Sequence, residues 1–207
     1  MELNEKKIKI MEVAEDLFAI NGFSGTSVRE IAKLADVNVA MINYYFESKD
    51  KLFESIFRYR GDYLRTRIET LINDTSITNW QKIDFFIDEY IERFSDNHKL
   101  HRILIREHGL TNNEGIRNFI NEAKYRNYQT ITNFVKRGQE QGDFNTEVDM
   151  MMLYTMIPGI TKFMLFNEDF LRFTLNRDHG YEPTHDEFKK RNKDFLKNAF
   201  RLILEKK

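Results

Sequence analysis

The segment SVREIAKLADVNVAMINYYFE, residues 27–47, decides the fold. Ser27 is followed three residues later by Glu30, the order of a capping box, in which the hydroxyl accepts from the Glu30 amide and the carboxylate reaches back. A short apolar-faced helix follows, then a two-residue turn, and Asn38 can cap a second short helix over residues 39–46. Helices this short need packing partners. Two of them joined by a tight turn form the helix-turn-helix pattern.

The second of these helices has two sides with different roles. Ile42 and Phe46 lie one turn apart and make its inward face. Asn43 can bond bidentately to adenine, and Val39 or Ala40 can touch a thymine methyl, so this helix suits a DNA major groove. The residues expected to face outward are Asn38, Val39, Ala40, Asn43 and Tyr44. The helix ends at Ser27 and Ser48 present amides suited to phosphate.

Composition favours an all-α chain. Only two prolines and nine glycines occur in 207 residues, whereas a sheet protein needs many turn formers. Cysteine is absent, which excludes thiol catalysis, thiolate metal sites and disulfides. Hydrophobic residues make up 41%, charged residues 31% and the formal charge is −1, as expected of a folded chain. The 18 phenylalanines and nine tyrosines predict a bulky interior able to hold a ligand.

Apolar periodicity predicts nine helices. They span residues 5–20, 28–35, 39–46, 49–72, 80–94, 100–110, 114–141, 148–166 and 186–205. We expect residues 1–48 to form a DNA-binding head of three helices, and residues 49–207 to form a helical bundle for effector binding and dimerisation. Pro158-Gly159 interrupts one bundle helix, which either opens a cavity, fits a dimer seam or is a tolerated kink.

Residues 10–57 resemble the DNA-binding domain of the tetracycline-repressor (TetR) family of bacterial transcriptional regulators. The pattern is AxxLFxxxGFxxTSVxxIAxxAxV, followed by YYF and SKxxLF. By this resemblance Tyr45 and Lys49 bind the DNA backbone, in addition to the helix end at Ser27. The resemblance also implies a homodimer formed through the last two long helices and a near-palindromic double-stranded DNA operator. It further implies a repressor that is released from this operator when a small molecule binds within residues 49–207.

We expect that effector to be apolar or aromatic, and no cofactor is expected. The candidate effector-binding residues are Phe86, Tyr90, Phe94, Ile105, Tyr125, Tyr128, Met151, Tyr154 and Phe163. The surplus of apolar residues on the two helices over residues 148–166 and 186–205 independently favours a dimer.

Other readings of the sequence remain open. Arg102, Arg106 and their histidine neighbours could meet an anionic ligand, although a solvated face is the commoner meaning. His98 and His101 lack the further ligands of a metal site, so no metal is predicted. Charge interrupts every apolar run near the start, so neither a membrane span nor a signal peptide is expected, and a cytoplasmic location follows.

Two alternatives to a DNA-binding repressor stand beside it. A helical-bundle enzyme or metabolite-binding protein is disfavoured because no nucleophile–base pair, phosphate loop or metal set is visible. A regulator acting through protein contacts alone is favoured only by the balanced charge of the head, with nine basic and ten acidic residues among residues 1–60.

Overall fold

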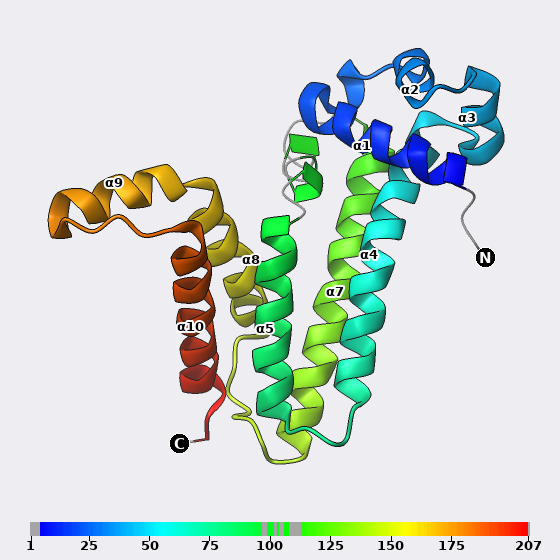
Figure 1. Cartoon of the computed structure of the whole chain (residues 1–207). Coiled ribbons are helices and arrows are strands. Elements are labelled where there is room, and N and C mark those ends of the chain that lie inside the picture. The colour runs from blue at the N-terminus through cyan, green and yellow to red at the C-terminus, as the bar shows by residue number, and fades with distance from the viewer. Residues whose placement is uncertain (1–4, 97–98, 102, 104–105, 108–112, 207) are drawn as a thin grey trace. The chain divides into compact units, whose positions relative to one another are not determined.

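The computed structural model describes residues 5–96, 99–101, 103, 106, 107 and 113–206. Every regular element in that part of the chain is a helix, which confirms the all-α prediction (Figure 1). The helices are α1 (Glu5–Gly25), α2 (Val28–Ala35), α3 (Val39–Phe46), α4 (Lys49–Asn73), α5 (Asn79–Asp96), α7 (Glu114–Glu140), α8 (Met150–Phe166), α9 (Glu168–His179) and α10 (His185–Leu204).

The chain divides into two compact units, and neither is a continuous stretch of sequence. The first comprises Met1–Glu69 with Asn97–Tyr125, and the second comprises Thr70–Asp96 with Arg126–Lys207. The division expected from sequence, at residue 48, separates two roles. It coincides with the start of α4 at Lys49 and stays a prediction.

The first unit holds the helix-turn-helix. Its core surrounds Phe18, Phe53 and Ile42, each at most 1% exposed. Ile103, Ile116 and Ile120 belong to the same buried cluster, although they lie far along the chain. Segments beyond residue 97 therefore complete the core on which the short helices pack.

Local sequence signals set the ends of these helices as expected. Gly22, at φ 76° and ψ 170°, interrupts the regular helix of α1 where the sequence predicts a stop. Asp36 takes the left-handed conformation that ends α2. The Ser27 hydroxyl accepts from the Glu30 amide, and Ser48 in the same way accepts from Lys51. These caps satisfy amides that the first turn of a helix leaves unpaired.

The second unit packs α10 and α8 against α5. Ile87, Ile91 and Leu196 are fully buried in its core. Along one side, three acidic residues of α5 pair with three basic residues of α10 in reverse order, and the pairs are Asp84–Arg201, Asp88–Lys197 and Glu92–Lys193. The two helices are therefore antiparallel. Helix α10 begins with a capping box, in which Thr184 and Glu187 bond each other's backbone in both directions.

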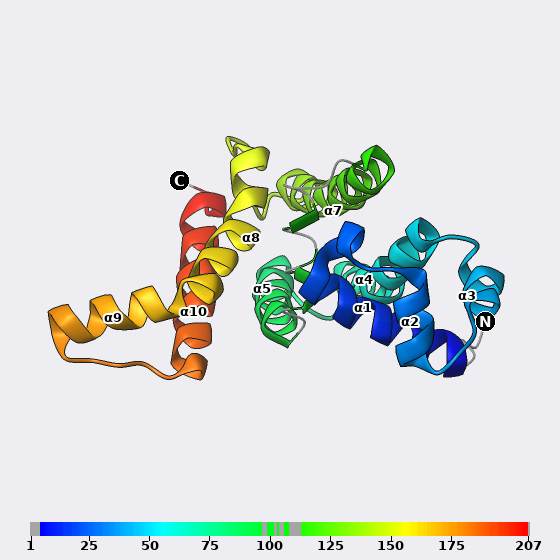
Figure 2. The same cartoon turned by 90° about the horizontal axis from the view of Figure 1, so that it is seen from above.

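Helix α9 is the element that the sequence reading missed. It projects away from α5, α8 and α10 (Figures 1 and 2). None of its residues is buried, although Phe170, Leu171, Phe173 and Leu175 recur at helical spacing in its sequence. The available signals were acidic residues in its first turn, Arg177 in its last turn, and Gly180 in the left-handed conformation directly after it.

Candidate nucleic-acid interface and effector site

Helix α3 presents the side chains expected to reach DNA. Ile42 and Phe46 are 1% and 3% exposed, so they fix the helix from behind. Tyr44 is 83% exposed, and Val39, Ala40 and Asn43 are exposed beside it. A helix held by buried residues on one side and carrying polar and small side chains on the other fits a major groove.

Three other residues predicted to contact DNA lie within α3 or before it along the chain. Asn38 caps α3, because its side-chain oxygen accepts from the Met41 amide at 2.8 Å. That cap leaves the two N–H groups of the Asn38 side chain for other acceptors. Tyr45 is half-buried and packs against the head core, with its ring 5.3 Å from that of Tyr44. Ser27 is exposed at the start of α2.

Lys49 has a role that the sequence did not reveal. Its ammonium donates to the carbonyls of Phe23 and Thr26, at 2.9 Å each, and lies 4.2 Å from the centre of the Phe23 ring. An ammonium has three N–H donors. Lys49 therefore fixes the chain before α2 with two of its three N–H groups, and its predicted phosphate contact stays a prediction.

A row of aromatic side chains crosses the second unit. On α5, the rings of Phe86, Tyr90 and Phe94 follow one another at 6.2 and 6.1 Å, and Phe166 of α8 lies 5.9 Å from Phe94. Tyr128 of α7 meets Tyr154 of α8 at 5.3 Å. We call these residues the aromatic wall: Phe86, Tyr90, Phe94, Tyr128, Tyr154 and Phe166.

Two tyrosines of the wall, Tyr90 and Tyr154, stay neutral. Burial raises the pKa of Tyr90 far above the ordinary phenol value, and the neighbouring Tyr154 raises it further. Burial also raises the pKa of Tyr154. Their hydroxyls can therefore donate hydrogen bonds at any physiological pH.

Lys162 stands on the same side of α8 as the wall. It lies eight residues after Tyr154 and four before Phe166, and this spacing follows one face of a helix. Burial lowers the pKa of Lys162. No carboxylate of the described residues pairs with it. Sequence reasoning missed both Lys162 and Phe166, because neither is marked by a motif.

Five of the nine predicted effector residues belong to the wall, and four do not. Met151 and Phe163 are 57% and 55% exposed on α8. Tyr125 is 55% exposed and falls in the other compact unit. Ile105 lies outside the described residues. The α5 row and the Tyr128–Tyr154 pair thus lie in the same compact unit, and their role in binding an effector stays a prediction.

Helices α8 and α10 each leave apolar side chains exposed, and we call these residues together the apolar face of α8 and α10. On α8, Met152, Gly159 and Phe166 recur every seven residues, and Phe163 lies among them. On α10, Phe195 and Leu202, 57% and 78% exposed, are likewise seven residues apart. A Cβ placed at Gly159 would meet nothing within 4 Å. A face of this kind is typical of a protein interface.

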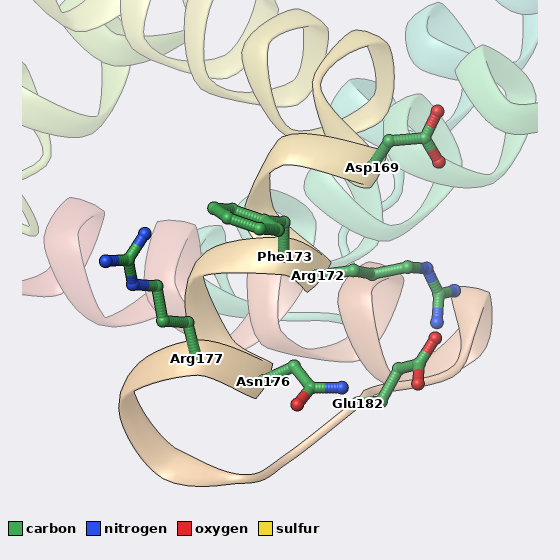
Figure 3. Close-up of a pocket in the computed structure, with 6 residues that line it drawn as sticks. All are labelled: Asp169, Arg172, Phe173, Asn176, Arg177 and Glu182. Carbon is green, nitrogen blue, oxygen red and sulfur yellow. The ribbon is translucent and has the colours of Figure 1, made fainter.

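A surface pocket of about 340 Å³ lies on α9 and the loop after it. Figure 3 shows its lining, which consists of Asp169, Arg172, Phe173, Asn176, Arg177 and Glu182. None of these residues was predicted to bind the effector. Arg172 is already engaged, since it pairs with Glu168 and donates to the Pro183 carbonyl.

The described residues contain no cluster of three or more histidine, cysteine or carboxylate side chains placed to hold a metal ion. None of the helices described here is both long and apolar enough to span a bilayer.

Two family models match the chain. Residues 10–56 match "Bacterial regulatory proteins, tetR family", and residues 81–195 match "Tetracyclin repressor-like, C-terminal domain". The chain belongs to the TetR family. As a TetR-family protein it is a helix-turn-helix transcriptional regulator that binds DNA operators, and the enzyme alternative falls because the family is not enzymatic.

Individual relatives of this TetR-family chain agree. It is 46% identical over 106 residues to the "Probable HTH-type transcriptional regulator YttP" of Bacillus subtilis, covering 49% of each protein, so the alignment spans about half of that relative's length. Its fold is similar to that of the fatty acid degradation regulator FadR from Bacillus halodurans, with a TM-score of 0.73 and 22% identity over 97% of this chain and 99% of that one. FadR from Bacillus subtilis in complex with stearoyl-CoA gives a TM-score of 0.67, with 22% identity over 91% and 96% of the two chains.

Proposed function

We propose that this TetR-family regulator is a homodimeric repressor that leaves a near-palindromic operator when a small apolar-tailed molecule binds at the aromatic wall. The observation that carries the proposal is the placement of α3, with Ile42 and Phe46 buried while Asn43 and Tyr44 face outward. Residues 1–48 would contact DNA, and the remainder would bind effector and partner. Action on chromosomal DNA agrees with the expected cytoplasmic location.

The apolar face of α8 and α10 supports the dimer. An isologous contact would place Gly159 and Phe163 of one copy against the same helices of the other. Gly159 allows two helix backbones to approach closely, which favours the dimer-seam reading of Pro158-Gly159. Two-fold symmetry would hold both copies of α3 at a fixed separation, so the half-sites would lie about one helical turn of DNA, or a multiple of it, apart.

The wall and Lys162 support an effector with a long apolar part and an anionic end. Rings and half-buried hydroxyls suit an acyl or aromatic chain. Lys162 supplies the cation, and the solved FadR complex with stearoyl-CoA shows that a protein of this fold accommodates such a molecule. Release from DNA would follow if the effector bound the DNA-free arrangement more tightly than the DNA-bound one.

A gel shift with the DNA that flanks the protein's own gene tests the proposal. We expect specific retention that weakens steeply with salt. Asn43→Ala should lose discrimination at one base pair, by about 1–3 kcal/mol, whereas the exposed Asn176→Ala on α9 should bind like the wild type. No retention at low salt would refute the function.

The effector arm of the same experiment uses three probes with one chain length. Stearoyl-CoA and stearate should release the DNA, and Lys162→Met should weaken release by both while leaving any release by uncharged stearyl alcohol unchanged. If none of the three probes releases the DNA, the proposed effector class is wrong, although the operator-binding result stands by itself.

A further inference from the structure

Residues 20–26 cover the irregular end of α1 around Gly22 and the first residue after it, and we call this segment the turn before α2. It is bound by side chains from distant parts of the chain. Inside it, the Thr26 hydroxyl donates to the Gly22 carbonyl at 2.8 Å, and Phe23 packs edge-on against Phe53. Lys49 holds the carbonyls of Phe23 and Thr26. Because Thr26 immediately precedes Ser27, this turn sets where α2 begins.

Two further residues act on the turn from more than 80 positions away. Arg106 donates from its two terminal nitrogens to the carbonyls of Ile20 and Asn21, at 3.0 Å each. Glu107 is 4% exposed and accepts from the Phe23 amide at 2.9 Å. We call Arg106 and Glu107 the latch.

Arg106 and Glu107 supply the hydrogen-bond partners that an interrupted helix end lacks. The last carbonyls of a helix have no partner in the helix, and a guanidinium presents two parallel N–H groups to them. The Phe23 amide follows the break at Gly22 and needs an acceptor, which a carboxylate supplies as a charge-assisted hydrogen bond. The sequence Arg106-Glu107 therefore satisfies donors and acceptors on both sides of Gly22.

Gly22 is fitted to the latch in two ways. Its φ of 76° is a conformation that other residues rarely adopt. A Cβ at this position would also lie 2.7 Å from Nε of Arg106. The turn and the guanidinium thus form one close-packed unit, and Arg106, which sequence reading grouped with possible anion ligands, is committed to backbone carbonyls.

We propose that Arg106 and Glu107 are positioning residues for DNA binding, which act through the turn on the start of α2 and on Lys49. The amides after Ser27 and the remaining N–H of Lys49 are groups expected to bind phosphate, and this inference rests on that part of the proposed function. Loss of the latch frees the turn, so these phosphate contacts weaken while the base contacts of α3 are unchanged. Operator affinity falls equally on all sequences.

The test measures operator affinity and its salt dependence for Arg106→Ala and Glu107→Ala. Each substitution should raise the dissociation constant about tenfold, as expected for a lost charge-assisted hydrogen bond. The slope of affinity against salt should fall by about one, while the penalty for a mismatched base pair stays that of the wild type. Glu107→Gln, which can still accept from the Phe23 amide, should recover part of the affinity.

Lys99→Ala is the matched control. Lys99 joins the same part of the chain to α1 through Asp16, at 2.6 Å, but does not touch the turn. It should bind the operator like the wild type. Arg106→Lys replaces Arg106→Ala if circular dichroism shows that the alanine variant does not fold. Lysine keeps the positive charge but cannot present two parallel N–H groups to the two carbonyls.

Unchanged affinity and salt slope in the folded latch variants would overturn the inference, as would an equal loss in Lys99→Ala or a loss of base discrimination. Failure of the wild type itself to bind any operator would be a failure of the proposed function, and the two results are therefore distinguishable.

Discussion

The two compact units differ in how far their aromatic side chains are buried and in where their charged side chains form pairs. In the first unit the phenylalanines Phe18, Phe23 and Phe53 pack on one another and are at most 5% exposed. Its charged groups bond inward as well, since Glu15 is 5% exposed and pairs with Arg60 at 2.7 Å. The second unit instead leaves Phe163, Phe173 and Phe195 more than half exposed.

The two units therefore differ in whether their phenylalanine rings are covered within a single copy of the chain. The first unit covers the rings of Phe18, Phe23 and Phe53 within its own core and pairs the buried Glu15 with Arg60. The second unit pairs its charges along the side shared by α5 and α10 but leaves apolar side chains uncovered on α8, α9 and α10. Apolar area of this extent is ordinarily covered by a partner.

Two phenylalanines test the contrast most strongly. Phe53→Ala removes a fully buried ring that contacts Phe18, Phe23 and Phe57, so it should cost about 3–5 kcal/mol of folding free energy and abolish operator binding. Phe163→Ala removes the same atoms from an exposed position and should change the folding free energy of one copy by much less. Urea unfolding at a concentration that keeps the chain monomeric measures both. Equal losses would contradict the contrast.

A charged substitution tests whether the apolar face of α8 and α10 binds a second copy of the chain. Phe163→Glu should weaken self-association by about 2 kcal/mol, or about thirtyfold in the dissociation constant, because an unpaired carboxylate would be buried in the partner contact. Leu34→Glu, which adds the same charge at an exposed apolar residue of the head, should leave association unchanged. Sedimentation velocity across a concentration series gives the constants. A wild type that stays monomeric would remove the assigned role of the face.

The sequence predicted those features that depend on local spacing. Ile42 and Phe46 were placed inward by their four-residue interval, the caps at Ser27 and Asn38 by short motifs, and the end of the first helix near residue 20 by the apolar periodicity. The aromatic row on α5 followed from the same periodicity. Each of these signals lies within a few residues and needs no knowledge of tertiary contacts.

Contacts over long separations could not be predicted. The Arg106 and Glu107 bonds to the turn, and the Glu15–Arg60 pair, join residues whose identity and spacing carry no local pattern. Helix α9 was also missed, although its apolar residues Phe170, Leu171, Phe173 and Leu175 recur at helical spacing. The completion of the head by Ile103, Ile116 and Ile120 was not predicted either, since apolar residues reveal a buried face but not which neighbour covers it.

The smallest expected difference between the two units concerns the space around two glycines, Gly138 and Gly61. A Cβ at Gly138 in the second unit would lie 2.3 Å from a ring carbon of Phe144, which is itself fully buried. Gly138→Ala should therefore cost about 1–3 kcal/mol of folding free energy, because the ring cannot move without displacing Trp80 and Phe134. Gly61 in α4 has no atom within 4 Å of the same position.

Gly61→Ala should accordingly stabilise the chain by about 1 kcal/mol through helix propensity alone. The change in folding free energy caused by a glycine-to-alanine substitution is thus expected to have opposite signs in the two units. Thermal unfolding of both variants beside the wild type measures it. If Gly61 is instead where α4 bends during release from DNA, Gly61→Ala will also raise the stearoyl-CoA concentration needed for release. A stabilised variant with an unchanged release curve would assign Gly61 no part in the switch.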